Sequence, residues 1–579
     1  MIRSDSGRPP SRGAVWGIAA ILLAAGLPQF IGRAADLQVK PRSLHPLVAA
    51  LSAADSGGAP IKCGFVVLSQ ALGQRSGLSL ETRTLLQGLM LRPLLQTSVA
   101  SGIFRVHFDT SGINTPALLD ASGMRIPGTA RAYADSVTRI LKEVADELET
   151  RHGFQLPPTD GTLGGGPEYD VYIEELSGEY GRTTPDVDIP DGTTVTSFIE
   201  IDNDFSFVYP DSNKGLPALR VTIAHEFHHA VQIGSYAYWQ SEVYFHEMTS
   251  VWVEELLFTE VNDYYLYLRS SSGHFRAPHV PFTTSDLISY SRGIWGIYLE
   301  KRFGPGLMRA IWEECRETRP TQAIDVILRQ PSRNSSMTAA FTEWALWNYW
   351  TGARSKGTAY YPEAPAYPEI VLVPTEFVPP TTAITQKLPP LSTRYHQVLV
   401  PTGTGRMDTV TLALNNVDYP SALSGTLLPI SYTWRLASTP VDPSYRQTNA
   451  GIYVKLDVAE PLNWTAWIIE DSLANPGVSM ASLEEGMAFP NPFTPDGSKF
   501  LYIPVDDPAP VSGSFSIYSG NMDRVYESGP VRSSGVTRQL FSWDGRTSSG
   551  QSAPTGIYIY VLSLDGGKTV RGKIAVLRK

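Results

Sequence analysis

Cysteine, basic clusters and long apolar runs are scarce or missing in this sequence of 579 residues. Only Cys63 and Cys315 are present, so the chain can form at most one internal disulfide. No run of lysine and arginine occurs, and the formal net charge of −10 at pH 7 argues against nucleic acid or an anionic membrane as a partner. Beyond residue 27 no stretch is long and apolar enough to span a bilayer.

The overall composition is that of a folded, multidomain protein. Apolar residues make up 42% of the chain and charged residues only 18%, which is enough apolar material to bury large cores. A chain of this length is too long for one core, and two to four domains of about 100 to 200 residues each are expected.

The N-terminus has the order of a secretory signal peptide over residues 1–35. Arginines precede an apolar run at 14–27, and the small residues Ala34 and Ala35 follow. A membrane anchor is the alternative, although the run is shorter than the ~20 residues of a spanning helix. We therefore expect an exported protein that is secreted or displayed at the cell surface.

In an oxidising compartment, two cysteines suggest a single disulfide between Cys63 and Cys315. The alternative is that Cys63, in the string Lys62-Cys63-Gly64, lies in a propeptide and caps a zinc ion as a thiolate. The sequence leaves both possibilities open.

Patterns of apolar residues predict an α+β domain in the first half of the chain. Strands are expected at 103–108, 169–173 and 196–201, and helices at 129–152 and 219–233. Helical patterns continue to about residue 349, and a proline-rich linker ends near residue 390. Short alternating runs broken by Gly and Pro then indicate β-sandwich modules.

These patterns divide the chain into five segments. They are the signal peptide at 1–35, an N-terminal segment at 36–100 that could be a propeptide, a catalytic domain at 101–370, a β-sandwich domain at 385–480 and a C-terminal domain at 486–579.

The string His225-Glu226-Phe227-His228-His229 carries the chemistry. His225 and His229 are four residues apart on a predicted helix, so their imidazoles can hold one metal ion. Glu226 can take a proton from a water molecule that a zinc ion acidifies. His228 faces away from the pair and is interpreted as a packing or surface residue. The competing interpretation is that these histidines only pack inside an ordinary helix.

A catalytic zinc ion needs a third protein ligand. One common class of zinc peptidase, the metzincins, would require Gly at 232 and His at 235, but these positions hold Gln232 and Ser235. The other common arrangement takes a glutamate from a following helix, and Glu247 is the candidate. His246, Glu242 and Glu255 are the rival ligands if the phase of that helix is misjudged.

The motif resembles that of the gluzincin metallopeptidases, in which a later helix supplies a ligand glutamate and a small residue three positions on, here Glu247 and Ser250. Tyr290-Ser291-Arg292-Gly293 is similar to the Tyr-x-Lys-Gly element of gluzincin aminopeptidases. The resemblance implies a zincin-like fold and implies that Tyr290 stabilises the oxyanion.

One position departs from the gluzincin pattern. Some members carry an acidic residue four positions after the ligand glutamate, which supports a ligand histidine, but this position is Val251 here. Glu254, on the same helical face as Glu247, could take the role instead.

The last segment contains the strings Phe489-Pro490-Asn491-Pro492, Trp543-Asp544-Gly545 and Thr555-Gly556. In these strings the chain from about residue 488 onward resembles the Ig-like domain of flagellar hook-capping proteins and the C-terminal sorting domains of type IX-secreted proteins. This resemblance implies contact with the export machinery, and the alternative is a spacer without a sorting role. The whole layout also resembles bacterial proteins that join an HEFHH-type metallopeptidase domain to C-terminal β modules.

We therefore expect an α+β zincin-like catalytic domain followed by all-β sandwich modules. The expected function is that of an exported, monomeric zinc metallopeptidase that hydrolyses peptide bonds in a protein or peptide substrate. The alternatives are a metal-dependent hydrolase of a non-peptide bond and an inactive zincin-fold surface adhesin. The intact Glu226 argues against the adhesin.

Overall fold

The computed structural model describes Leu47 and residues 61–578, apart from gaps at 189, 402–406, 426–427, 449, 459–463, 471–487, 489–490, 496–499, 506–510 and 534–538. The expected signal peptide at 1–35 lies outside the described residues. All of the described elements belong to one compact unit, Pro41–Lys579. No helix in these ranges is long and apolar enough to cross a membrane.

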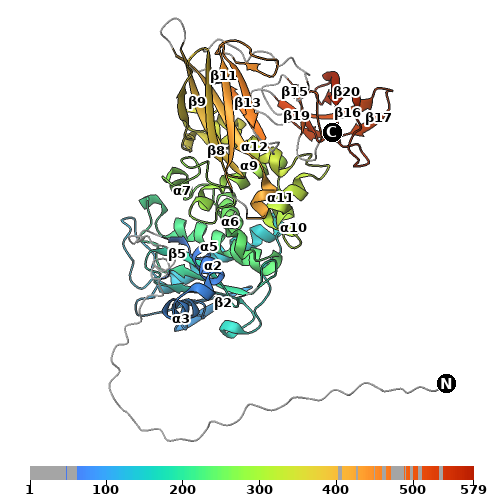
Figure 1. The fold of residues 1–579 in the computed structure, drawn as a ribbon. Coiled ribbons are helices and arrows are strands. Elements are labelled where there is room, and N and C mark those ends of the chain that lie inside the picture. The colour runs from blue at the N-terminus through green and yellow to red at the C-terminus, as the bar shows by residue number, and fades with distance from the viewer. Residues whose placement is uncertain are drawn as a thin grey trace, which may run out of the picture. The chain divides into compact units, whose positions relative to one another are not determined.

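A mixed six-stranded sheet begins the described chain (Figure 1). Its strand order is β1-β5-β6-β4-β3-β2, and its strands are β1 (Ile61–Cys63), β2 (Thr97–Ser101), β3 (Phe104–Phe108), β4 (Tyr169–Glu174), β5 (Glu179–Pro185) and β6 (Ser197–Asp202). β5 runs antiparallel to β6, and β1 pairs parallel with β5 at the edge. β1 and β2 come from the predicted N-terminal segment at 36–100, yet they form the two edges of a sheet that continues into the next segment.

Two long helices pack on this sheet. They are α4 (Ala130–Asp146), which contacts β3, and α5 (Leu216–Val231), which contacts β5 and β6. The predicted strands and helices of this part are confirmed, except that the helix expected at 219–233 does not end at residue 233, because helical turns continue to Tyr236. β5 is not predicted from the sequence.

The helices of residues 243–349 follow the sheet, as expected. They are α6 (Val243–Leu257), α7 (Tyr265–Arg269), α8 (Ile288–Ser291), α9 (Ile294–Phe303), α10 (Leu307–Glu314), α11 (Pro320–Leu328) and α12 (Met337–Tyr349). Two further helices, α2 (Phe65–Gly73) and α3 (Leu80–Leu89), follow β1. α6 packs directly on α5, and together with the sheet it buries almost every α5 side chain from Ala218 onward.

Two four-stranded sheets form the next module, and their buried residues share one apolar core, as in a β-sandwich. Their strands are β7 (Val373–Glu376), β8 (Thr381–Leu388), β9 (Ser392–Pro401), β10 (Met407–Asn416), β11 (Ile430–Ala437), β12 (Arg446–Gln447), β13 (Tyr453–Val458) and β14 (Trp464–Glu470). A short helix, α13 (Tyr419–Leu423), interrupts the run. The expected β-sandwich is therefore present, and its first strand starts before residue 385.

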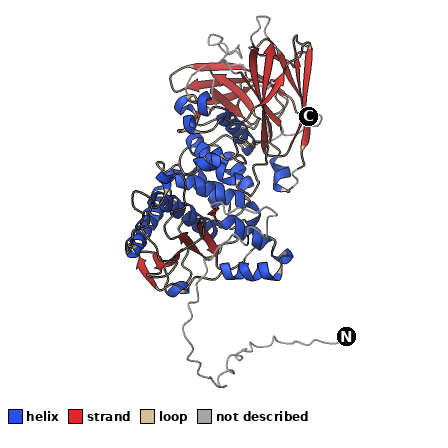
Figure 2. Cartoon of the chain, turned by 90° about the vertical axis from the view of Figure 1, so that its left-hand side faces the viewer, coloured by secondary structure: helices blue, strands red, loops and turns tan. Residues whose placement is uncertain are grey.

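The C-terminal module is also built from strands around its own apolar core. They are β15 (Leu501–Val505), β16 (Ser512–Ser519), β17 (Arg524–Glu527), β18 (Val531–Arg532), β19 (Gln539–Trp543), β20 (Gly556–Leu564) and β21 (Thr569–Val576). Figure 2 shows that strands predominate toward the C-terminus, whereas helices accompany the first sheet. The structure thus combines an α+β part with all-β modules.

Close packing between α9 and α6 depends on two glycines, Gly296 within α9 and Gly293 at its N-cap. A Cβ atom at Gly296 would lie 2.5 Å from Cγ of Trp252, and one at Gly293 would lie 2.5 Å from Cγ1 of Val251. Distances this short force one helix to move. The glycines therefore fix the position of α6.

We expect Gly296→Ala to lower the free energy of unfolding by about 1–3 kcal/mol, because the added methyl group overpacks the α6 contact. The matched control is Gly88→Ala on the exposed face of α3, where a Cβ meets nothing within 4 Å. Gly88→Ala should be neutral or stabilising. Scanning calorimetry of the full chain measures both, and equal stability of the two variants would contradict the packing argument.

Candidate metal centre

Helix α5 places two histidine rings on consecutive turns of the same face. Nε2 of His225 and Nε2 of His229 lie 3.1 Å apart, and both side chains are buried. In a tetrahedral zinc site with bonds of about 2.0–2.1 Å, two ligand nitrogens are separated by roughly 3.3 Å. The pair therefore has the spacing of two ligands on one ion.

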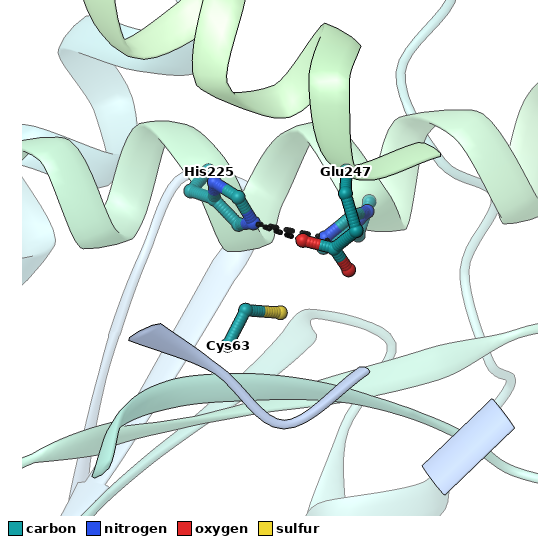
Figure 3. A group of neighbouring side chains, drawn as sticks. Cys63, His225 and Glu247 are labelled. Atoms are coloured by element: carbon teal, nitrogen blue, oxygen red, sulfur yellow. Dashed lines mark hydrogen bonds and ion pairs between the residues drawn. The ribbon is translucent and has the colours of Figure 1, made fainter. Parts of the chain in front are cut away.

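Helix α6 brings a carboxylate to the same point. Oε2 of Glu247 is 3.1 Å from Nε2 of His225, and Oε1 is 3.3 Å from Nε2 of His229. Glu247 is fully buried. Figure 3 shows Glu247 next to His225, with its carboxylate turned toward the histidine nitrogens. The structure thus brings together the three ligands predicted from the sequence.

The expected disulfide between Cys63 and Cys315 is not formed, because both are free, buried thiols. Cys63 instead lies in the histidine and glutamate cluster. Its Sγ, one nitrogen of each histidine and one Glu247 oxygen all lie within 4.8 Å of one another. In Figure 3 the sulfur enters from β1, on the side opposite the helices.

These four residues fit a transition-metal ion. Two imidazole nitrogens, a carboxylate and a thiol are the donor types found in tetrahedral zinc sites. The cluster could therefore hold a metal ion.

Hydrogen bonds outside the cluster orient both histidines. Oε1 of Glu254 lies 2.7 Å from Nδ1 of His225, and Oε1 of Gln232 lies 2.9 Å from Nδ1 of His229. When Nδ1 donates to such an acceptor, the tautomer leaves Nε2 free to bind a metal. Glu254 thus has the supporting geometry considered for it in the sequence.

Glu226 follows His225 on α5 and is also fully buried. The hydroxyl of Thr183 on β5 donates to Oε2 of Glu226 at 2.8 Å and also lies 2.8 Å from its backbone oxygen. Burial raises the pKa of Glu226, although the neighbouring His225 and His229 oppose the shift. Oε1 has no hydrogen-bond partner among the described residues. One carboxylate oxygen is thus held by Thr183, and the carboxylate also interacts with the thiol of Cys63.

Tyr290 on α8 reaches the same place. Its hydroxyl donates to the backbone carbonyl of Cys63 at 3.4 Å, and its ring centre is 6.2 Å from that of His225. The hydroxyl of Tyr290 therefore lies beside the cluster, against the main chain of β1.

The other candidate residues lie outside the cluster. His246 contacts Gln232 and the backbone N–H of Trp239, Glu242 contacts Tyr244, and neither joins the metal-type group. Glu255 also lies outside the cluster, and burial raises its pKa to about 9. His228 is buried and packs edge-on against Phe154 and Trp312.

Residues 61–65, called the β1 segment below, cover the cluster on the side away from α5 and α6 (Figure 3). The ring of Phe65 stacks on His229 at 4.4 Å, and Nζ of Lys62 lies 2.5 Å from Oδ2 of Asp263 and 3.0 Å from Oε2 of Glu254. Burial and the charges of Glu226 and Glu247 raise the pKa of Cys63 far above its usual value. A bound metal ion would reverse that preference, because a coordinating thiol loses its proton.

Sequence reasoning missed four residues that shape this centre. Gln232 lies three residues after His229, so helical spacing alone could have indicated it. Lys62 adjoins Cys63, but its partner Asp263 is 201 positions away. Thr183 belongs to β5, the strand that the sequence does not reveal. Contacts this distant in sequence need the tertiary fold.

No protein-family model matches the chain, and no curated protein matches it. Several solved structures are similar over part of it, and two of them come from the same bacterium. Dimeric latent PorU from Porphyromonas gingivalis is 14% identical, with 35% of this chain and 19% of that chain covered and a TM-score of 0.15. PorZ, a surface component of the type-IX secretion system of the same bacterium, is 12% identical, with 32% and 37% covered and a TM-score of 0.12. This chain thus matches only a minor part of either protein, and TM-scores this low assign no fold.

We expect the purified full chain to bind about one zinc ion per molecule, because the four donors form one site. His229→Ala and Glu247→Gln should each reduce metal content strongly. Glu226→Gln should retain it. Glu255→Gln is the matched control on α6, since that carboxylate lies outside the cluster. Elemental analysis after dialysis measures metal content, and full metal content in Glu247→Gln would contradict the ligand assignment.

Proposed function

We propose that this protein is an exported zinc-dependent peptidase. The observation that carries the proposal is the convergence of His225, His229 and Glu247 on one buried point, with Glu226 beside them on α5. Two histidines and a glutamate leave one position of a tetrahedral zinc site for water or substrate. A hydrolytic site needs this arrangement together with a nearby base.

A zinc ion held by these ligands would acidify a water molecule and polarise the substrate carbonyl. Glu226 supplies the base. Thr183 holds Oε2 in place, so Oε1 can accept a proton from the attacking water and later pass it to the leaving amine. The buried position of Glu226 raises its proton affinity, which favours the first transfer, from water to the carboxylate.

The substrate backbone would lie along β5. Ile61 of β1 donates to the carbonyl of Gly178 at 3.0 Å, and Gly64 donates to the carbonyl of Gly181 at 2.9 Å. This edge therefore already binds one extended segment by main-chain hydrogen bonds. Tyr290 would donate to the oxyanion, since its hydroxyl contacts a β1 carbonyl at the same edge.

The cluster is closed to substrate in this structure, and we propose that this conformation is a latent form of the peptidase. His225 is 1% exposed, and Glu226, His229 and Glu247 are 0% exposed, so no peptide can reach them while β1 is in place. Cys63 occupies the position that water would need. This arrangement favours the zinc-capping alternative for Cys63 over the disulfide.

Glu226→Gln should lower peptide hydrolysis by about a hundred-fold to ten-thousand-fold, because the amide cannot accept the proton. The variant preserves side-chain size, so zinc content should be unchanged. Hydrolysis of a mixed peptide library by both proteins, followed by mass spectrometry, measures the effect. Equal cleavage by both would exclude Glu226 as the base. Activity on esters or other amides without peptide cleavage would favour the non-peptide hydrolase.

Cys63→Ala should raise peptide hydrolysis by the full chain by about ten-fold or more, because removing the sulfur increases the fraction of open sites. Cys315→Ala is the matched control, since Cys315 is an equally buried thiol outside the cluster. Initial rates and zinc content are measured for both variants. A rate unchanged by Cys63→Ala, with zinc retained, would show that Cys63 does not block the site.

A further inference from the structure

Lys62 is a buried cation held in a pocket of opposite charge. The residue is 3% exposed, and its Nζ contacts Oδ2 of Asp263 at 2.5 Å and Oε2 of Glu254 at 3.0 Å. The same Nζ lies 4.8 Å from the ring centre of Tyr180, in cation–π range. Carboxylates and an aromatic face therefore surround one ammonium group.

The residues around Lys62 are positioned by contacts that do not involve Lys62. Nδ2 of Asn213 donates to Oδ1 of Asp263 at 3.3 Å, and Oε1 of Glu254 contacts Nδ1 of His225 at 2.7 Å. Tyr180 lies on β5, which is paired with β6 independently of β1. The three walls thus belong to the turn after α6, to α6 itself and to the sheet, so the pocket is preorganised without the β1 segment.

The pocket adjoins the cluster of Cys63, His225, His229 and Glu247. Lys62 precedes Cys63 in β1, and Cys63 pairs with Gly181 of β5. Glu254 contacts both His225 and Lys62, so a single side chain joins the two sites. An extended chain that pairs with β5 and crosses the cluster would place a neighbouring side chain near Asp263.

We propose that Tyr180, Glu254 and Asp263 form a specificity pocket for a lysine or arginine side chain of the substrate, adjacent to the cleaved bond, and that Lys62 occupies this pocket as an internal mimic. The inference rests on the proposed peptidase function. A neutral substrate side chain in the pocket would leave the buried carboxylates of Glu254 and Asp263 with one cation fewer, and unpaired buried charges are unfavourable. The pocket should therefore prefer a cationic side chain.

The cleavage test uses the full-length double variant Lys62→Ala/Cys63→Ala, in which the pocket and the cluster are both freed. In a peptide library, cleavage next to lysine should exceed cleavage next to methionine, which has a similar length, by about ten-fold or more. Asp263→Asn on this background should bring that ratio close to one. The control is Asp135→Asn, an exposed carboxylate on α4, which should leave the ratio unchanged.

Cleavage without a preference for cations, or a preference that survives Asp263→Asn, would refute the pocket while leaving the peptidase proposal intact. Absence of any Glu226-dependent cleavage would refute the peptidase proposal instead. A second measurement then tests the pocket without catalysis.

That measurement is thermal unfolding of full-length Lys62→Ala in n-propylammonium, which replaces the deleted part of the lysine side chain. Binding should raise the midpoint by about 2–4 °C, or restore soluble yield if the variant folds poorly. Neutral 1-propanol should have no such effect, and neither should n-propylammonium on Lys62→Met, whose side chain fills the space. No rise, or an equal rise with 1-propanol, would refute a cation-binding pocket.

Discussion

The packing of α6 on α5 is the contact on which the whole site depends. α5 supplies His225, Glu226 and His229, but only α6 brings Glu247 within 3.3 Å of both histidine nitrogens. α6 also packs against α9 and its N-cap, where a Cβ on Gly296 would meet Trp252 and one on Gly293 would meet Val251. Two residues without side chains therefore help to determine whether the third predicted ligand reaches the cluster.

Buried charge is the second constraint, and it connects the site to the β1 segment. Glu226, Glu247, Glu254 and Asp263 are all removed from water, and each needs a cation or a hydrogen-bond donor nearby. Lys62 satisfies two of them. The segment that covers the cluster is therefore held by electrostatics as well as by its sheet hydrogen bonds, and its release would expose carboxylates that must find another partner.

Local patterns predicted the parts of the fold that obey them. β3, β4 and β6 carry apolar residues in strand order, and α4 has one apolar face, so each was expected near its observed bounds. β5 was missed because Glu179–Pro185 is polar in sequence yet buried throughout. Its Arg182 is neutralised by Glu179 and Glu200, each at 2.7 Å, and no periodicity reveals such a pairing.

From the sequence alone, His225 and His229 could be placed together beside Glu226, because residues four apart on a helix share one face. The sequence also singled out Glu247 and raised the two roles open to Cys63. That Cys63 lies in the cluster, apart from Cys315, follows from the tertiary structure, since the distance between Cys63 and a helix more than 150 residues away depends on how β1 pairs with β5. The pocket around Lys62 has the same origin, because its walls come from separate elements that meet only when the sheet and α6 pack together.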